Sequence, residues 1–171
     1  MSDNQLFYKI NVTKLLSDLN ITVDEKNILQ KDQRPYFSYV RLNDIYSSFI
    51  PIRTNLTHKY GFITKSSRDR NGNMRHSGLD YTKSLIFKTS CINDYIIEEI
   101  GISFKEYQKV KDNNNKIIYD YKRFLFDTFL NIANKEPNHR NRVESNIYNF
   151  STLQYMEHII KDIAQKSLKS G

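Results

Sequence analysis

The sequence has no tryptophan, one cysteine, three prolines and five glycines in 171 residues. Cys91 has no partner for an internal disulfide, and no cysteine and histidine cluster has the spacing of a zinc site. No apolar run approaches the roughly 20 residues that a membrane-spanning helix needs. The N-terminus, MSDNQLFYKI, lacks the basic flank and long apolar stretch of a secretory signal. These absences predict a soluble cytoplasmic protein in a reducing compartment, with no membrane partner.

Several catalytic motifs are also missing. The sequence has no P-loop, no dinucleotide-binding glycine pattern, no HExxH motif and no acidic cluster of the kind that two-metal nucleases use. His58 and His76 lack a recognisable metal-ligand spacing, so we expect no metal and no other cofactor. RNA can be cleaved without a metal, because its own 2′-hydroxyl can attack the adjacent phosphate if the protein moves protons and stabilises the extra negative charge.

The positive charge of the chain is concentrated in one stretch. The net charge is +7, and residues 53–88 contain eight Lys or Arg against two Asp or Glu, whereas the segments on either side are nearly balanced. A local excess of this kind indicates a binding site for a polyanion. A solvated, flexible basic loop is the alternative.

Two kinds of periodicity divide the chain. The first half alternates as strands do, and the predicted elements are a strand at 6–12, a short helix at 12–19, a hairpin at 36–42 and 45–52, and a strand at 84–90. The second half has helical spacing, and the predicted helices are 93–100, one beginning at Ser103, 117–133 and one around 153–163. Ser103 and Glu106 have the spacing of a capping box at the start of the second of these helices. Polar connectors are expected at 24–33 and 134–146. We predict one α+β domain spanning 1–171, with an antiparallel sheet or small barrel carrying the basic loops and helices packed against it.

The segment PIRTNLTHK at residues 51–59 follows the second predicted hairpin strand and is the strongest candidate for a reaction centre. Arg53 and Lys59 can contact phosphate oxygens, and Thr54 and Asn55 can donate hydrogen bonds. His58 is suited to proton transfer near neutral pH. A hydrogen-bonded turn with scattered surface charges is the alternative.

Two further clusters flank this segment. In QRPY, Pro35 fixes the backbone before the first hairpin strand, so that Arg34 and Tyr36 are held at its end. In GLDYTK, before the strand at 84–90, Asp80, Thr82 and Lys83 either orient a neighbouring base or bind the ribose and phosphate of RNA. An exposed arginine in the first cluster and a turn cap in the second are the structural alternatives.

The tract between the second and third clusters, KSSRDRNGNMRHSG, is predicted to be mobile and to contact the RNA backbone regardless of its sequence. The basic residues expected to do so are Lys65, Arg68, Arg70, Arg75 and His76.

Four short blocks, FYKI, RPYF, PIRTNLTHKYGF and GLDYTKSLIF, spanning residues 7–87, resemble the toxins of type III toxin-antitoxin systems, in the TenpN branch of the ToxN and AbiQ superfamily. The resemblance implies a metal-independent endoribonuclease with a compact, barrel-like sheet related to the Kid and MazF toxins. It implies cleavage that leaves a cyclic phosphate, and inhibition by a small structured antitoxin RNA in a cyclic or other higher-order assembly. Abortive defence against bacteriophage is the implied role.

The resemblance also assigns residues. The strand-end hydroxyl of the family falls on Thr54, and the basic residue before the first hairpin strand falls on Arg34, with Tyr36 beside it. Arg53 stands where ToxN has a first hydroxyl, which leaves a lysine role to Lys59. His58 is the acid or base on chemical grounds alone.

Two other functions fit the same residues. The chain can be a non-catalytic RNA-binding module, in which Tyr36, Tyr39, Tyr60 and Phe62 stack on bases beside the basic stretch. Aromatic residues at strand spacing are more often core residues. Alternatively, the basic stretch binds an anionic membrane or an acidic protein, although it lacks the apolar face of a membrane-surface helix.

Overall fold

The protein has an α+β fold with a seven-stranded antiparallel sheet, as the periodicity predicts. The computed structural model describes residues 6–22 and 34–169, with side chains described as far as Lys166. The strands are β1 (Phe7–Ile10), β2 (Tyr36–Arg41), β3 (Tyr46–Arg53), β4 (Gly61–Arg68), β5 (Met74–Asp80), β6 (Leu85–Lys88) and β7 (Ile96–Glu99). Their order is β4-β5-β3-β2-β1-β7, and β6 also pairs with β3.

The sheet is open. A barrel closes only when its first and last strands pair, and within the described residues β4 and β7 end the sheet without pairing with each other. The prediction of an antiparallel sheet is therefore confirmed, while a closed barrel is not formed by these strands.

Strand β3 pairs with β2, β5 and β6. It forms the predicted hairpin with β2, with Tyr36 opposite Pro51. The Asn43 side chain closes the hairpin by accepting hydrogen bonds from the backbone N–H groups of Ile45 and Tyr46. The other edge of β3 is shared, because its first half pairs with β6 and only Ile52 and Arg53 pair with β5. As a result β5 leaves the sheet from the end of β3.

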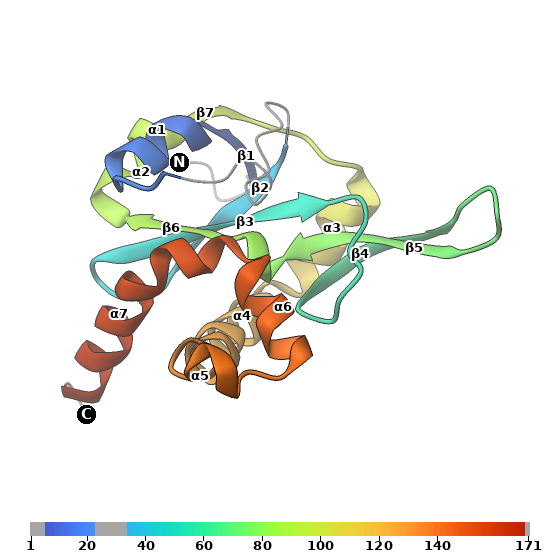
Figure 1. Ribbon diagram of the computed structural model, residues 1–171. Helices are drawn as coiled ribbons and strands as arrows, with labels where there is room; N and C mark the ends of the chain where they lie inside the picture. The colour runs from blue at the N-terminus through green and yellow to red at the C-terminus, as the bar shows by residue number, and fades with distance from the viewer. Residues whose placement is uncertain (1–5, 23–33, 170–171) are drawn as a thin grey trace.

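The basic tract predicted to be mobile is instead a regular hairpin of β4 and β5, which projects far beyond the rest of the molecule (Figure 1). The Asp69 carboxylate organises its tip by accepting from the backbone N–H groups of Asn71 and Asn73, both at 2.9 Å. Gly72 adopts φ +82°, which favours glycine. Local turn chemistry orders this segment, and the pattern of basic residues gave no sign of it.

The helices lie on both sides of the sheet. They are α1 (Val12–Asp18), α2 (Ile92–Tyr95), α3 (Phe104–Asp112), α4 (Asn114–Arg123), α5 (Leu130–Ala133), α6 (Arg142–Asn149) and α7 (Glu157–Lys169). A π-helical segment, Phe124–Phe129, joins α4 to α5, so the helix predicted at 117–133 is confirmed but starts earlier. Short 3₁₀ turns occur at Tyr81–Lys83, Thr89–Cys91, Pro137–His139 and Thr152–Met156.

Three predictions in the second half need correction. The helix predicted at 93–100 ends at Tyr95, and its remainder is β7, which pairs with β1. The loop predicted at 134–146 contains the start of α6, where Asn141 and Glu144 form a capping box. The capping box expected at Ser103 is absent, because the Ser103 hydroxyl bonds the Glu106 side chain instead. The connector at 24–33 lies outside the described residues.

One cluster of buried side chains joins the sheet to the helices, with Phe49, Phe87 and Tyr121 among its largest members. Tyr121, from α4, bonds Ser48 of β3 and Ser84, which ties the helices to the centre of the sheet. No helix in the described part of the chain is both long and apolar enough to cross a membrane.

Candidate functional site

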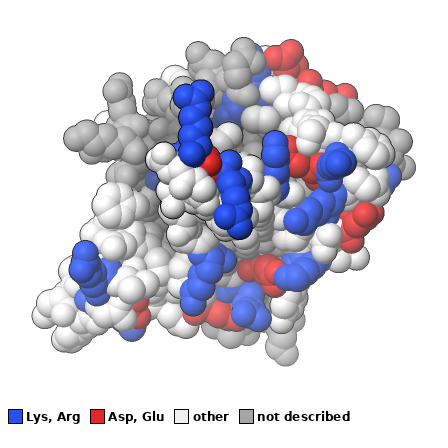
Figure 2. Space-filling view, turned by 90° about the vertical axis from the view of Figure 1, so that its right-hand side faces the viewer, with Lys and Arg blue, Asp and Glu red and all other residues white. Residues whose placement is uncertain are grey.

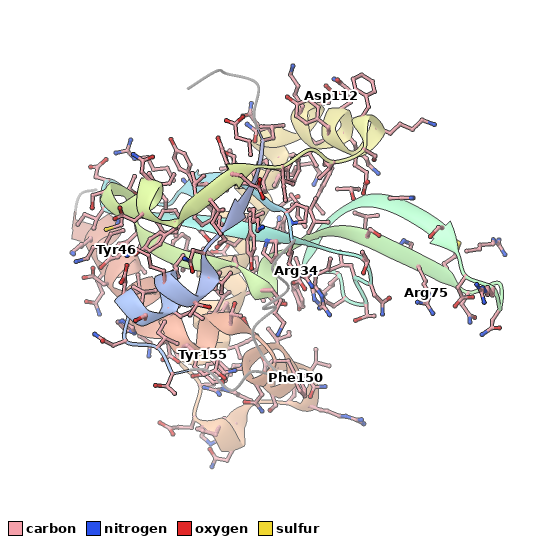
Figure 3. All side chains as sticks on the ribbon, turned by 90° about the horizontal axis from the view of Figure 1, so that it is seen from above. Arg34, Tyr46, Arg75, Asp112, Phe150 and Tyr155 are labelled. Atoms are coloured by element: carbon pink, nitrogen blue, oxygen red, sulfur yellow. The ribbon has the colours of Figure 1, made fainter. Side chains whose placement is uncertain are left out.

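Two pockets open at the place where β3 ends and the projecting hairpin begins. Successive side chains of a strand point to opposite faces, and the last residues of β3 follow this rule. Ile52 and Thr54 line a pocket beside the N-terminus of α3, whereas Arg53 lines a pocket beside α6. Figure 3 shows the hairpin leaving the molecule between α3 and the α5 and α6 region, with Arg34 at its base. The segment predicted as one reaction centre is thus divided between two sites.

The pocket beside α6, called the α6 pocket below, has a volume of about 550 Å³. One wall comes from the end of β3 and the segments that follow β3 and β5, with Arg53, His58, Thr82 and Lys83. The opposite wall comes from α6 and the residue after it, with Val143, Ile147 and Phe150. A second hollow, along α5 and α6, shares Tyr60, Val143 and Ile147 with it, so the two hollows adjoin.

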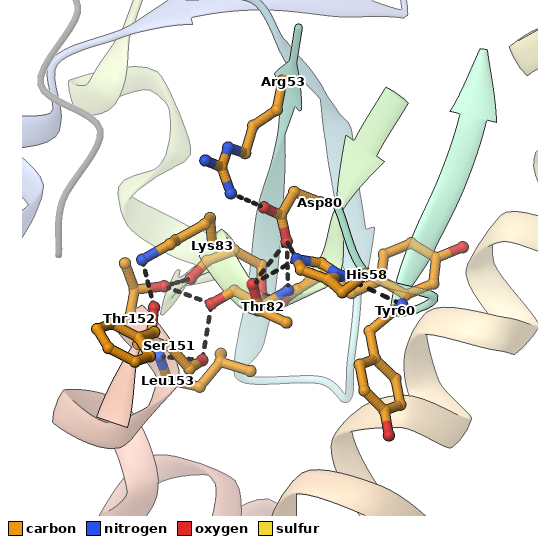
Figure 4. Close-up of polar contacts among 12 residues, drawn as sticks. Arg53, His58, Tyr60, Asp80, Thr82, Lys83, Ser151, Thr152 and Leu153 are labelled. Atoms are coloured by element: carbon orange, nitrogen blue, oxygen red, sulfur yellow. Dashed lines mark hydrogen bonds and ion pairs between the residues drawn. The ribbon is translucent and has the colours of Figure 1, made fainter. Parts of the chain in front are cut away.

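The buried carboxylate of Asp80 organises the α6 pocket (Figure 4). Its side chain is 0% exposed, and its Oδ2 accepts from Arg53 Nη1 at 2.9 Å. Its Oδ1 lies 3.3 Å from His58 Nε2 and accepts from the Thr82 hydroxyl at 2.6 Å and the Thr82 backbone N–H at 3.0 Å. Burial by itself would raise the pKa of this carboxyl. The hydrogen bonds from His58, Thr82 and Arg53 outweigh burial and hold its pKa below the usual value, so Asp80 is ionised.

The segment that carries Asp80 is fixed from the C-terminal side of the chain. The Ser151 hydroxyl donates to the carbonyl of Thr82 at 2.7 Å, and the Thr152 hydroxyl donates to the carbonyl of Ser84 at 2.7 Å. The Lys83 ammonium donates to the carbonyl of Phe150, and burial lowers the pKa of this lysine. The cations of the α6 pocket are therefore held in place before any ligand arrives.

The hydrogen bonds of His58 define its tautomer. Nδ1 accepts from the backbone N–H of Tyr60 at 3.3 Å, so Nδ1 carries no proton and the proton of the neutral ring is on Nε2, facing Asp80. The bond to Tyr60 is longer than the 2.9–3.0 Å typical of N–H···O bonds, and it is correspondingly weak. Nδ1 is therefore the nitrogen that can exchange its partner for a ligand hydroxyl.

The pocket beside α3, called the α3 pocket below, has a volume of about 440 Å³. Its apolar surface comes from Pro35, Ile52 and Ile102. Its polar rim comes from Arg34, Thr54, Lys65, Ser77, Ser103 and Glu106. Arg34 Nη1 donates to the carbonyl of Ile52 at 2.9 Å, but Arg34 Nε is buried and has no hydrogen-bond partner in the described part of the chain. Burial lowers the pKa of Arg34, and the nearby positive charge of Arg53 acts in the same direction.

A β-bulge shapes the rim of the α3 pocket. The register between β4 and β5 shifts at Thr64, since Ile63 faces Gly78 while Lys65 faces Ser77. Bulges of this kind redirect side chains. Here the Thr64 hydroxyl donates to Glu106 Oε1 at 2.8 Å, and the next residue, Lys65, lines the same pocket.

The projecting hairpin brings further positive charge to this side of the molecule. Lys65, Arg68, Arg70 and Arg75 are exposed on it, and only Arg75 is paired, with Asp69 at 3.2 Å, among the ion pairs of the described residues. His76 shares a hydrogen bond with Ser66. Figure 2, which looks onto the end from which the hairpin projects, shows blue side chains across the centre with fewer red ones between them. The basic tract is therefore a surface that a polyanion can reach.

Some predicted site residues lie elsewhere than expected. Tyr36 is only 2% exposed and packs its ring edge against Phe49, so it is a core residue. Asp80 is 0% and Thr82 6% exposed, so their side chains offer RNA almost no surface, although Thr82 lines the α6 pocket. Their predicted contacts with ribose and phosphate stay predictions. The other reading of that cluster, in which Asp80 orients a neighbouring base, agrees with its contact to His58.

Asn55 and Lys59 are exposed and line neither pocket, although the Lys59 ammonium lies 5.4 Å from the ring centroid of Tyr60. Of the four aromatic residues considered for stacking on bases, Tyr60 alone lines either the α3 or the α6 pocket, and its ring lies 5.1 Å from that of Phe124 and 6.2 Å from that of His58. The Phe62 ring faces Lys109 of α3 at 6.0 Å, and Tyr39 lies on β2, away from both pockets.

Several residues that line the two pockets were not predicted as site residues from the sequence. Glu106 and Ser103 were noticed only as a helix signal, and Val143, Ile147 and Phe150 fell in or next to a predicted loop. They approach the end of β3 only because α3 and α6 pack on either side of it. No spacing in the sequence relates them to Arg53 or Thr54.

The chain matches no family model, no curated protein and no solved structure. Within residues 6–22 and 34–169, no three His, Cys, Asp or Glu side chains group closely enough to hold a metal ion.

Proposed function

We propose that the protein is a metal-independent endoribonuclease whose reaction centre lies where β3 ends, between the two pockets. The observation that carries the proposal is the pair of arginines at this point. Arg53 is held on the buried Asp80 carboxylate, and Arg34 keeps a buried N–H group without a partner in the described residues. An anchored cation needs little reorganisation to stabilise charge that develops on a phosphate.

In the proposed reaction the 2′-hydroxyl of one nucleotide loses its proton to a base, and its oxygen forms a bond to the adjacent phosphorus. The bond from phosphorus to the 5′-oxygen breaks, and that oxygen leaves with a proton from an acid. The products are a 2′,3′-cyclic phosphate and a 5′-hydroxyl. His58 Nδ1 accepts a proton in this scheme once it exchanges its weak bond with Tyr60 for the hydroxyl.

The other groups stabilise the additional negative charge. Arg53 lines the α6 pocket, and the next residue, Thr54, lines the α3 pocket. In this scheme both stabilise the phosphate that lies at the end of β3, between the two pockets. The Thr54 side chain is exposed, and its hydroxyl has no hydrogen-bond partner among the described residues. Lys65, Arg68 and Arg70 hold the RNA backbone along the projecting hairpin.

The wider proposal follows the resemblance of the short blocks. The protein acts in the cytoplasm as the toxin of a type III toxin-antitoxin system, related to the Kid and MazF toxins. A repeat-derived structured RNA inhibits it, in a cyclic or other higher-order assembly, and its role is abortive defence against bacteriophage. Short tandem repeats followed by a terminator, directly upstream of the gene, support this assignment if they are found.

The direct test is cleavage of a labelled RNA in excess EDTA, with identification of the new ends. We expect cyclic phosphate ends, and a loss of rate of at least about 100-fold in His58→Ala and in Thr54→Ala. A proton-transfer group typically contributes 10²–10⁴, and one hydrogen-bond donor to the developing charge contributes about 10²–10³. Thr13→Ala and His139→Ala, at exposed positions outside both pockets, are the matched controls. Wild-type rates in both site variants would refute the assignment of these residues.

A non-catalytic RNA-binding module is the second candidate. It is favoured by one observation, which is that both ring nitrogens of His58 already have protein partners. The same assay decides between the two, because a binding module retains RNA at low salt and produces no new ends.

A further inference from the structure

The α3 pocket differs from a phosphate site in the charges that face it. Arg34 and Lys65 are opposed by the carboxylate of Glu106, and no ion pair joins Glu106 to either cation within the described residues. A phosphate would meet the carboxylate, and a cationic ligand would meet Arg34 and Lys65. The pocket instead suits a neutral, planar group that presents hydrogen-bond donors on one side and an acceptor beside them.

The Glu106 carboxylate is fixed in one orientation. Oε1 accepts from Thr64 of β4 at 2.8 Å, and Oε2 accepts from Ser103 at 2.7 Å. A carboxylate offers about four lone-pair sites, so each oxygen can accept one more hydrogen bond. Two adjacent N–H donors on a ligand would fill these two remaining acceptor sites of Glu106.

The remaining groups of the pocket fit an acceptor and a flat ring. Arg34 lines the pocket, and besides the Nη1 group that donates to the Ile52 carbonyl its guanidinium has further N–H groups that can donate to a ligand acceptor. The Lys65 ammonium is exposed at the rim. Pro35, Ile52 and Ile102 supply apolar surface for the faces of a ring.

We propose that the α3 pocket binds a guanine base of the RNA substrate, with Glu106 accepting hydrogen bonds from N1–H and the N2 amino group, and with Arg34 and Lys65 donating to O6. Guanine is the RNA base that has two neighbouring donors next to an acceptor. Adenine and cytosine offer one amino group, and uracil places a single N–H between two acceptors. Each of them leaves part of the carboxylate unpaired, and a site built to hydrogen-bond a group rejects analogues that lack it.

The position of the pocket gives this base a place relative to the reaction centre. Ile52 and Thr54 line the α3 pocket, and Arg53, between them, reaches the α6 pocket. A guanine held by Glu106 would therefore lie at a fixed distance along the chain from the phosphate that Arg53 contacts. The inference rests on the proposed function in one respect, namely that the ligand is RNA.

The test is titration calorimetry of the whole protein with 3′-GMP, 3′-AMP, 3′-CMP and 3′-UMP, which share one phosphate and differ in the base. We expect 3′-GMP to bind at least about tenfold more tightly than the others, as bidentate base contacts typically allow. Glu106→Gln keeps an acceptor for Thr64 or Ser103 but replaces one acceptor by a donor, and it should abolish this preference. Asp112→Asn makes the same change of charge at the far end of α3 (Figure 3) and should leave it intact.

Equal affinities for the four nucleotides in the wild-type protein would overturn the inference, whatever the fold of the variant. A guanine preference that survives in a folded Glu106→Gln protein would also overturn the role of Glu106. Cleavage mapping separates this result from the proposed function. RNA cut without a guanine at a fixed position contradicts only the base assignment, whereas preferential 3′-GMP binding without any RNA cleavage contradicts only the nuclease.

Discussion

The α6 and α3 pockets lie on opposite sides of the same strand end and differ in how far their charged groups are paired. In the α6 pocket the buried Asp80 satisfies Arg53, His58 and Thr82, so the polar groups are paired before a ligand arrives. In the α3 pocket Glu106 and Arg34 face one cavity without an ion pair between them, and one buried donor of Arg34 is unsatisfied in the described residues. The first arrangement is suited to holding a cation in place for chemistry, and the second to recognising a ligand.

The largest expected effect is on stability, and it separates the two pockets. Asp80→Ala leaves Arg53 without its carboxylate in a partly buried place, and removing one partner of a buried pair typically costs 3–5 kcal/mol. We expect Asp80→Ala to lower the free energy of unfolding by about that amount. Glu106→Gln, at a half-buried carboxylate that accepts two hydroxyl groups, should lower it by about 1 kcal/mol or less.

Urea unfolding followed by circular dichroism measures both losses. Equal losses in the two variants would show that the pockets do not differ in this way.

The second effect is the pH dependence of stability. The pKa of Asp80 is lowered in the folded protein, so its stabilising contribution is fully present above the unfolded value near 3.8 and is lost as the pH falls through the folded pKa. The difference in unfolding free energy between wild type and Asp80→Asn should thus be present at about pH 5 and should shrink below about pH 4. Urea titrations at a series of pH values measure this difference. A difference that grows as the pH falls would contradict a lowered pKa of Asp80 in the folded protein.

The smallest effect on stability is expected for the projecting hairpin, which contributes Lys65 and Ser77 to the α3 pocket. Arg68 is exposed and lines neither pocket, so Arg68→Ala should change the free energy of unfolding by less than about 0.5 kcal/mol. It should reduce the salt dependence of RNA binding by a slope of about 0.7, which is the loss of one phosphate contact to a single strand. Binding measured over a series of salt concentrations gives the slope.

Arg41→Ala, at the turn between β2 and β3, is the matched control and should leave the slope unchanged. If Arg68→Ala altered the preference for guanine, the outer part of the hairpin would also take part in base recognition, in addition to Lys65 and Ser77.

Much of the fold was predictable because the signals are local. The hairpin of β2 and β3, the strand at β6 and the helices α1, α3 and α4 follow from alternating or helical spacing and from turn residues such as Asn43. The failures have two different causes. β7 directly follows a helical turn, and it is a strand because β1 offers it an edge to pair with. The start of α6 was not predicted, because it lies among polar residues that were assigned to a loop.

The candidate site was predictable in its location and not in its arrangement. The sequence indicated the end of β3 and the basic tract, and Arg34, Thr54, Arg53 and His58 do line pockets there. Tyr36 was expected in the site but is buried in the core, because the first residue of a strand can face the core as readily as the site. Glu106 is 52 residues away from Thr54, and only the packing of α3 against β4 brings it to the same pocket.

The sequence by itself determined where the positive charge lies, where most of the strands and helices form, and that an arginine, a hydroxyl and a histidine occur together at the end of β3 and just after it. These properties depend on residue type and spacing over short distances. Only the tertiary structure decided that Arg53 and Thr54 serve different pockets, that Asp80 is buried beneath Arg53 and His58, and that the basic tract is a projecting hairpin. The physical reason is that a strand sends neighbouring side chains to opposite faces, and the partners on each face come from distant segments.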